Sequence, residues 1–186
     1  MDEQVILVDE KDNVIGFQEK FNAHLKGNLH RAFSVFIFDG AGNLLLQKRA
    51  RAKYHSGSLW SNTCCGHPRP GEATPEAAHR RLIEEMGFDC ELREVLCLIY
   101  KVEVDNNLLE HEYDHVFVGN FQGQPLPSLD EVEDWRWVPL EQLKNETYRS
   151  PERFTCWLTK IMKHSAMLTA ELPVTDSYEV GYLTQQ

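Results

Sequence analysis

Two short segments combine residue types that carry out proton transfer and metal binding. In the first, Cys65 stands beside Gly66 and His67, where a thiol is a candidate proton carrier or nucleophile. In the second, Glu110 and Glu112 are two residues apart, so both carboxylates point to the same face if the segment is a strand. Two such carboxylates repel each other unless a cation or a shared proton relieves them. The two segments therefore predict a site for acid–base chemistry.

Histidines elsewhere in the chain could extend this site into a metal centre. His24, His30 and His67 could complete a nitrogen and oxygen ligand set with the paired glutamates. That donor mixture suits a borderline divalent ion such as Mn²⁺ or Zn²⁺. The alternative is a polar strand edge with scattered surface histidines, and an isolated cysteine such as Cys65 is often a small buried apolar residue. Cys64 and its neighbours look like half of a zinc site, but no second Cys/His pair follows at finger-like spacing.

Two further carboxylates lie near the end of a predicted helix, over residues 74–86. The helix macrodipole makes acids mildly unfavourable at a C-terminal end. The helical period places Glu85 at the edge of the buried stripe that contains Leu82, whereas Glu84 lies further round. Surface ion pairs with the arginines one turn earlier would explain both acids. The other explanation is that Glu85 faces a cleft and binds a cation.

These segments need a scaffold, and the chain alternates strand and helix patterns. Apolar runs between turn signals predict strands at residues 5–8, 14–17, 32–38, 43–48, 92–104, 113–121 and 135–138. Thr74 as N-cap, Pro75 and Gly87 are typical of the boundaries of the 74–86 helix. Helical spacing recurs at residues 139–145 and 152–168, and the final residues are expected to be loosely ordered. The prediction is an α+β fold, a mixed β-sheet flanked by helices, in a single domain over residues 1–186.

Composition excludes several classes of function. The chain has 186 residues, with 19 basic and 29 acidic side chains and a net charge of −10. This charge argues against a nucleic-acid or acidic-membrane binder but leaves room for a small anion held by local cations. The N-terminus is acidic where a signal peptide is basic, and no apolar run approaches the roughly 20 residues of a membrane span. Five cysteines, an odd number, favour a reducing cytoplasm, and nothing indicates an obligate protein partner.

The segment from Gly66 to Phe88 resembles a known motif. Gly66, Glu72 and the run from Arg80 to Phe88 match the Nudix box, G-x5-E-x7-R-E-U-x-E-E-x-G-U, except that Arg81 stands where that family has glutamate. The resemblance implies an α/β/α Nudix-type fold and a divalent metal ion near a diphosphate. Nudix hydrolysis depends on the clustered glutamates of the box, so Arg81 argues against that activity.

Together the motifs resemble the type I isopentenyl-diphosphate isomerases, a Nudix-fold family that does not hydrolyse its substrate. The resemblance covers about residues 4–170 and includes the early histidines, the Cys-Gly-His-Pro stretch, the modified box, and Tyr100 ten residues before the Glu-x-Glu pair. It accounts for Arg81, because the isomerases also depart from the hydrolase box there. It implies interconversion of isopentenyl and dimethylallyl diphosphate through a carbocation-like intermediate, in isoprenoid biosynthesis.

The resemblance also implies roles for individual residues. The two proton-transfer groups would be Cys65 and Glu112, with Tyr100 assisting Glu112. One metal ion, Mn²⁺ or Zn²⁺, would be bound by His24, His30, His67, Glu110 and Glu112, and a Mg²⁺ by Glu85 with a diphosphate oxygen. The cations that bind the diphosphate would be Lys20, Arg49, Lys53 and Arg80. Trp157 would lie over the carbocation, and the alternative for it is a core position in the last helix.

Two other functions stay open at this level. A Nudix hydrolase of a nucleoside diphosphate derivative would release a fragment that contains phosphate. A binding module on a Nudix scaffold would bind diphosphates without turnover. The substitution Cys65→Ala separates them from the isomerase, because only the isomerase requires that thiol for turnover.

Overall fold

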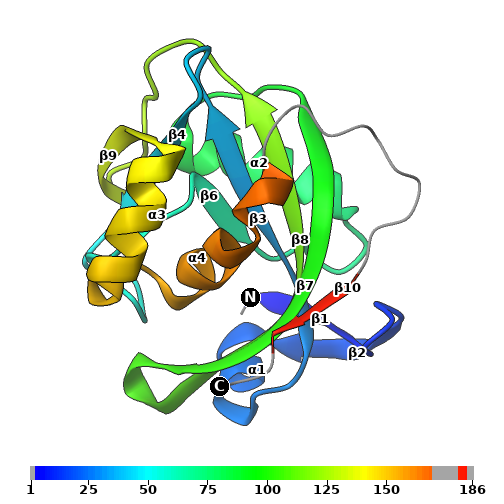
Figure 1. Cartoon of the computed structure of the whole chain (residues 1–186). Coiled ribbons are helices and arrows are strands. Elements are labelled where there is room, and N and C mark those ends of the chain that lie inside the picture. Colours follow the sequence, from blue (N-terminus) through cyan, green and yellow to red (C-terminus); the bar gives the residue numbers. More distant parts are fainter. Residues whose placement is uncertain (1–2, 169–179, 184–186) are drawn as a thin grey trace.

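A computed structural model describes residues 3–168 and 180–183 (Figure 1). The strands are β1 Gln4–Val8, β2 Val14–Glu19, β3 His30–Phe38, β4 Asn43–Arg49, β5 Trp60–Ser61, β6 Cys64–Gly66, β7 Leu92–Val104, β8 Leu108–Asn120, β9 Val132–Pro139 and β10 Val180–Leu183. The helices are α1 Lys20–Lys26, α2 Thr74–Met86, α3 Leu140–Arg149 and α4 Cys156–Ile161. Turns of 3₁₀ helix lie at Asp105–Asn107, Pro151–Arg153 and Met162–Leu168.

The described strands form one mixed sheet. Its main path runs β10-β7-β8-β3-β1-β2, and β4, β5, β6 and β9 extend it beside β3. At the centre, β3 is parallel to β8 with His30 opposite Glu112, and β7 is antiparallel to β8 with Tyr100 opposite Glu112. Paired residues share a face of a sheet, so His30, Glu112 and Tyr100 form one row across three strands.

Helices cover both faces of this sheet. On one face, Phe36 and Leu98 belong to an apolar cluster that includes Leu158 of α4. On the other face, Val35 and Leu82 belong to a second cluster, formed against α2. In Figure 1, α3 and α4 lie in front of the sheet and α2 lies behind it. The predicted α+β class, a mixed sheet flanked by helices, is therefore confirmed.

Helix α2, which carries the Nudix-box motif, has the predicted bounds, but its first residue has a different role from the predicted one. Helix α2 begins at Thr74 and not after it, so Ala73 occupies the N-cap and Thr74 makes no capping hydrogen bond. Pro75 lies in the first turn, where its missing N–H costs nothing. Gly87 ends the helix with a positive φ of 74°. Leu82 is fully buried and Glu85 is almost so, whereas Glu84 is partly exposed, as the helical period predicts.

The prediction of one helical stretch over residues 152–168 is wrong, because the chain is extended at Phe154 and Thr155. Phe154 forms a parallel bridge with Trp60, and the Thr155 N–H donates to the Trp60 carbonyl at 2.9 Å. Phe154 is buried in the core, and this burial favours the break. Helix α4 starts only after it, at Cys156.

Several elements lack a strong sequence signal. Helix α1 is capped by the Glu19 carboxylate, which accepts from the Phe21 and Asn22 N–H groups, where Ser, Thr, Asp or Asn is usual. The strands β5 and β6 have only two and three residues, too few to give a recognisable strand pattern. Strand β10 pairs in parallel with β7, so the prediction that the final residues are loosely ordered is wrong for β10. The other residues covered by that prediction, 169–179 and 184–186, lie outside the described residues.

Among the described helices, none has the length and apolar character needed to cross a bilayer.

Candidate active site

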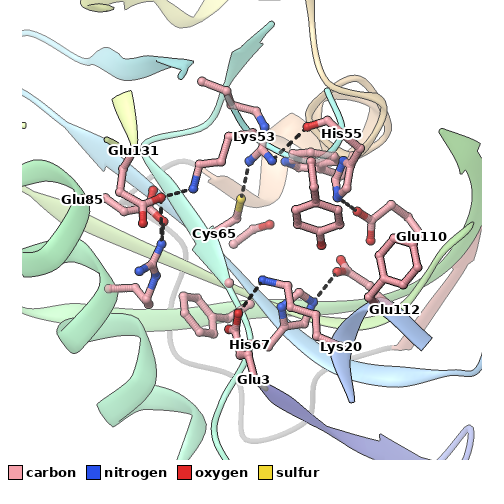
Figure 2. A pocket seen from close by; sticks show the side chains of 18 of the residues that line it. Glu3, Lys20, Lys53, His55, Cys65, His67, Glu85, Glu110, Glu112 and Glu131 are labelled. Carbon is pink, nitrogen blue, oxygen red and sulfur yellow. Dashed lines mark hydrogen bonds and ion pairs between the residues drawn. The ribbon is translucent and has the colours of Figure 1, made fainter. Parts of the chain in front are cut away.

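A cavity of about 370 Å³ gathers most of the predicted site residues (Figure 2). Those lining it are Lys20, Arg49, Lys53, Cys65, His67, Glu85, Glu110, Glu112 and Trp157. They come from α1, the end of β4 and the loop after it, β6 and the residue that follows it, α2, β8 and α4. In Figure 2, Cys65 lies between two groups, with Lys53 and Glu85 on one side and Glu110 and Glu112 on the other.

Three histidines converge on Glu112, which lines the cavity. His24, His30, His67 and Glu112 each offer one ligand atom, and these atoms lie within 4.8 Å of one another. The His67 Nε2 is 2.9 Å from the Glu112 Oε1, and the His30 Nε2 is 3.7 Å from the same oxygen. Because the pairing of β3 with β8 sets His30 opposite Glu112, the sheet itself fixes the centre of this group.

Glu110 forms a second group with His24 and with a residue that the sequence did not single out. The Glu110 Oε2 is 3.3 Å from His24 Nε2, and its Oε1 is 2.9 Å from His55 Nε2. The three side chains are a further candidate metal-binding set. Burial alone would raise the pKa of Glu110, but the two histidines outweigh it and hold that pKa well below its usual range. His55 thus contacts the same carboxylate as His24, and His24 is the residue that belongs to both groups.

The ligand atoms of this region fit a divalent metal ion. The Nδ1 atoms of His24 and His30 contact the backbone carbonyls of Lys20 at 2.7 Å and Asn28 at 2.8 Å, which leaves both Nε2 atoms facing the carboxylates. Such outer hydrogen bonds orient metal-binding imidazoles. His30 Nε2 and Glu110 Oε2 are buried without hydrogen-bond partners. Burial lowers the pKa of His30 to about 4, so its imidazole is neutral and able to bind a metal ion.

The two predicted proton-transfer groups, Cys65 and Glu112, both have raised pKa values. Burial raises the pKa of the Cys65 thiol to about 12, against a smaller opposing effect of Arg49, whose Nη1 lies 3.9 Å from the sulfur. Burial and the neighbouring carboxylates raise the pKa of Glu112 well above its usual range. Tyr100 lies behind Glu112 and donates its hydroxyl hydrogen bond to it. A thiol acid and a carboxyl group therefore share one cavity.

Asp114 is a further buried acid beside this site. It follows Glu112 by two residues on β8, is fully buried, and accepts a hydrogen bond of 2.9 Å from the Ser34 hydroxyl. Burial is the main reason that its pKa rises to about 7. Its alternation with Glu110 and Glu112 is visible in the sequence, but its burial is not.

Cations and carboxylates meet at the opposite end of the cavity. The Arg81 guanidinium pairs with Glu85 and lies 3.3 Å from Glu131, which also pairs with Lys53. Gln47 donates to Glu85 at 2.7 Å and orients it. Gly66 packs closely beside Arg81, and a Cβ there would lie only 3.1 Å from the Phe33 ring. An anion entering this end would find cations already gathered.

The structure does not bring Arg80 to the cavity. Its guanidinium makes two hydrogen bonds to Glu72, of 2.6 and 2.8 Å, and a third to Glu84. One residue along a helix rotates the side chain by about 100°, so Arg81 faces the cavity and Arg80 the outer surface. The sequence therefore pointed to the wrong one of two neighbouring arginines: Arg81, and not Arg80, lines the cavity.

Trp157 lies both in the core and at the cavity, the two positions that the sequence left open for it. It is 3% exposed and packs in the core cluster beneath α4, yet it also lines the cavity. Its Nε1 donates to the Ser61 Oγ at 3.0 Å and to the Asn62 Oδ1 at 3.1 Å, which fixes the plane of the indole. The Arg49 guanidinium lies 5.1 Å from the ring centre.

Comparison with known proteins identifies the family. The Nudix domain model matches residues 28–158. An isopentenyl-diphosphate Delta-isomerase 2 of Photorhabdus laumondii is 57% identical, over 87% of this chain and 92% of its own. An isopentenyl-diphosphate Delta-isomerase of Serratia proteamaculans is 55% identical, over 88% of this chain and 91% of its own. The chain belongs to the isopentenyl-diphosphate Delta-isomerase family. Sequence-based assignment to this family is thereby confirmed, and the hydrolase alternative is not supported.

Solved structures support the fold of this isomerase family member. The Deinococcus radiodurans protein DR0079 matches with a TM-score of 0.72 and 18% identity, over 87% of this chain and 98% of its own. A MutT protein of Methanosarcina mazei matches with a TM-score of 0.61, also at 18% identity, over 73% of this chain and 91% of its own. At this identity the likeness concerns the fold alone, and it is the Nudix fold predicted from the box.

Proposed function

We propose that the chain is an isopentenyl-diphosphate isomerase, which interconverts isopentenyl and dimethylallyl diphosphate. The observation that carries the proposal is the cavity shared by the Cys65 thiol and the buried Glu112 carboxyl group, with Lys53 and Arg81 gathered at its other end. A hydrolase needs the box glutamate that Arg81 replaces, and a binding module needs neither proton carrier.

The reaction moves a double bond by one carbon, so one proton must be added and another removed. An unactivated alkene is a very weak base, and its protonation produces a tertiary carbocation-like species. The site must therefore supply a positioned acid, a base and exclusion of water. Cys65 and Glu112 are the proposed pair, one giving a proton to the terminal carbon and the other accepting a proton from C2.

Tyr100 and Trp157 support these two steps in the proposal. The Tyr100 hydroxyl donates to Glu112 and keeps its carboxyl group in one orientation while its proton comes or goes. The indole ring of Trp157, held by Ser61 and Asn62, would stabilise the cationic intermediate by about 1–2 kcal/mol in a desolvated site.

The proposed ligands fall into two sets. His24, His30, His67, Glu110 and Glu112 would bind Mn²⁺ or Zn²⁺, and Glu85 with a diphosphate oxygen would bind Mg²⁺. When bound, the first ion supplies positive charge that offsets two buried carboxylates, and the second neutralises the diphosphate. Nitrogen and oxygen donors suit the first ions, and an oxygen set suits Mg²⁺.

The diphosphate group would be bound by cations that line the cavity. Lys20, Arg49, Lys53 and Arg81 all line the cavity in a chain whose net charge is −10, with Lys53 at the Glu85 end and Lys20 nearer Glu112 (Figure 2). Lys53 and Arg81 now pair with Glu131, so the diphosphate would compete with that carboxylate for them. A small diphosphate is the proposed partner, without nucleic acid or membrane. We place the activity in the cytoplasm, because all five cysteines are free.

Proton NMR of isopentenyl diphosphate with the purified protein, Mg²⁺ and Mn²⁺ in D₂O tests the function. Loss of the vinylidene signal, growth of an allylic CH signal and entry of deuterium into the substrate carbons would establish the isomerase. Cys65→Ala should abolish this conversion, and Cys64→Ala is the matched control, since the Cys64 side chain packs in the core with α2. An unchanged alkene with phosphate release would point to a hydrolase, and binding without either change to a binding module.

A further inference from the structure

A second cluster of metal-binding residue types lies on the other face of the sheet. Cys97 of β7 and His115 of β8 are directly opposite each other in the antiparallel pair. Each is three residues from a member of the active site, Tyr100 and Glu112 respectively, so strand alternation points them away from the cavity. Neither residue lines the cavity or has a part in the proposed reaction.

A β-bulge brings a carboxylate to the same point. The pairing steps from Glu94–Phe117 to Leu96–Val116, which leaves Val95 as the extra residue. Val95 and Leu96 both pack in the same core cluster, and Glu94 therefore shares the opposite face with Cys97. Without the bulge, residues three apart would lie on different faces. The irregularity in β7 is thus what completes the cluster.

The three side chains are in mutual contact. The Cys97 Sγ lies 3.1 Å from the Glu94 Oε1 and 3.5 Å from the His115 Nδ1, and the Nδ1 lies 2.7 Å from the same Glu94 oxygen. The other ring nitrogen of His115 faces the Asp12 Oδ2 at 3.2 Å. Asp12, in the turn between β1 and β2, is held in place by Arg31 at 2.7 Å.

We propose that Glu94, Cys97 and the Nδ1 of His115 form a Zn²⁺ site separate from the active site. Sulfur, nitrogen and oxygen donors together are typical of zinc, with a water molecule as fourth ligand of a tetrahedron. Asp12 would be the outer carboxylate that fixes the ring of a zinc-bound histidine. The active-site set has only nitrogen and oxygen donors, so thiolate ligation distinguishes the two sites.

The charges balance when the ion enters. In the metal-free cluster, Asp12 and Glu94 carry two negative charges, and Arg31 and protonated His115 carry two positive ones, with Cys97 a neutral thiol. Both ring nitrogens of His115 face carboxylate oxygens, Nδ1 that of Glu94 at 2.7 Å and Nε2 that of Asp12 at 3.2 Å, which favours the imidazolium. Binding of Zn²⁺ releases one proton from the imidazolium and one from the thiol, so two positive charges leave as two enter.

Only a small movement is needed to accept the ion. Tetrahedral zinc bonds place nitrogen and oxygen ligands about 3.3 Å apart, and sulfur about 3.5 Å from either. The distance from Cys97 to His115 already has this value. Glu94 must retreat from both by about half an ångström, and its side chain is one-quarter exposed and free to do so. The zinc would join β7 to β8 and, through Asp12, to the β1–β2 turn.

Cobalt titration of the chelator-stripped full chain tests the site, since Co²⁺ bound by a thiolate has a charge-transfer absorption in the near ultraviolet. We expect this absorption in the wild type and in Cys65→Ala, its loss in Cys97→Ser, and its displacement by Zn²⁺. Cys90→Ser is the matched control, because Cys90 is a partly buried cysteine outside the cluster, and it should keep the signal.

A second, milder substitution is needed because Cys97 is buried, and loss of the signal in Cys97→Ser has to be separated from unfolding. Glu94→Gln keeps the size of a partly exposed side chain and should weaken cobalt binding at this site by about tenfold or more. Thermal unfolding of each variant reports whether it is folded. Absence of the thiolate band in the wild type, its persistence in Cys97→Ser, or unchanged affinity in folded Glu94→Gln would each overturn the zinc site. None of these results depends on isomerase turnover.

Discussion

Tyr100 and Glu112 lie directly opposite each other in the β7–β8 pair, and the Tyr100 hydroxyl donates a hydrogen bond to the Glu112 carboxyl group. Both side chains are buried, so this contact is made away from water. The orientation of the proposed proton carrier is thus set by the register of two strands. We expect Tyr100→Phe to lower turnover by up to about tenfold with little change in KM, because an ordinary hydrogen bond contributes about 0.5–1.5 kcal/mol.

Steady-state kinetics on isopentenyl diphosphate would measure the effect of Tyr100→Phe. Tyr113→Phe is the control, since Tyr113 is a buried tyrosine of β8 that packs with Ile99 in a different cluster. Equal turnover of Tyr100→Phe and wild type would remove the tyrosine from the mechanism.

Arg81 and Arg80 offer a matched pair for the diphosphate site. Arg81 lines the cavity, whereas Arg80 is tied to Glu72 outside it. We expect Arg81→Ala to raise the KM for isopentenyl diphosphate about 10- to 100-fold, because charge-assisted hydrogen bonds are lost. Arg80→Ala should leave KM near the wild-type value and reduce thermal stability instead. A larger rise of KM in Arg80→Ala would contradict the corrected assignment.

His55 should act through Glu110. Its Nε2 is 2.9 Å from the carboxylate, which also contacts His24. We expect His55→Ala to weaken Mn²⁺ binding about 10- to 100-fold, the usual cost of losing a group that orients a metal ligand. Isothermal titration calorimetry would measure it, with His79→Asn as control, since His79 pairs with Asp89 at the surface. Unchanged affinity would leave His55 without a role in the metal site.

Removal of metal should abolish isomerisation without unfolding the chain. The proposed ligands have buried polar atoms without hydrogen-bond partners, among them His30 Nε2 and Glu110 Oε2. We expect exhaustive chelation to stop turnover, and Mg²⁺ together with Mn²⁺ or Zn²⁺ to restore it, while the far-ultraviolet circular dichroism stays constant. Full activity in the metal-free protein would refute the ligand assignment.

Asp114 should make the metal-free protein less stable as pH rises. Its pKa is about 7 in the folded chain and near 3.8 when unfolded, so between these values the folded state binds the extra proton. Stability therefore falls with increasing pH across this interval. Asp114→Asn imitates the protonated form and should raise the free energy of unfolding at pH 7 by more than about 1 kcal/mol.

Urea unfolding at pH 5 and pH 8 would check this difference for Asp114→Asn. Asp130→Asn in an exposed turn is the control and should leave the pH slope unchanged. A wild-type slope in Asp114→Asn would show that another group is responsible.

Much of this site could be predicted because its residues lie on regular elements. Alternation along β8 placed Glu110 and Glu112 on one face, and the period of α2 placed Glu85 at the buried edge. The box fixed the fold, and with it the approach of Cys65. These inferences needed only local periodicity and a recognised motif.

The rest depended on contacts that periodicity does not encode. His55 belongs to an irregular loop where Ser56 and Ser58 have positive φ angles, so no repeat predicts that it meets Glu110. The choice between Arg80 and Arg81 required knowing on which side of α2 the cavity lies. The break at Phe154 came from pairing with Trp60, almost a hundred residues earlier.

The β7–β8 hairpin carries one set of chemical groups on each face, and its turn has two asparagines with positive φ angles, Asn106 at 64° and Asn107 at 58°. A one-residue slip of β8 would exchange its faces, turning Glu112 outward and His115 inward. Both the cavity and the cluster around Cys97 would be lost in the same event. A misaligned hairpin would therefore disrupt both groups together, so the proposed activity and the proposed zinc binding should be lost in the same fraction of chains.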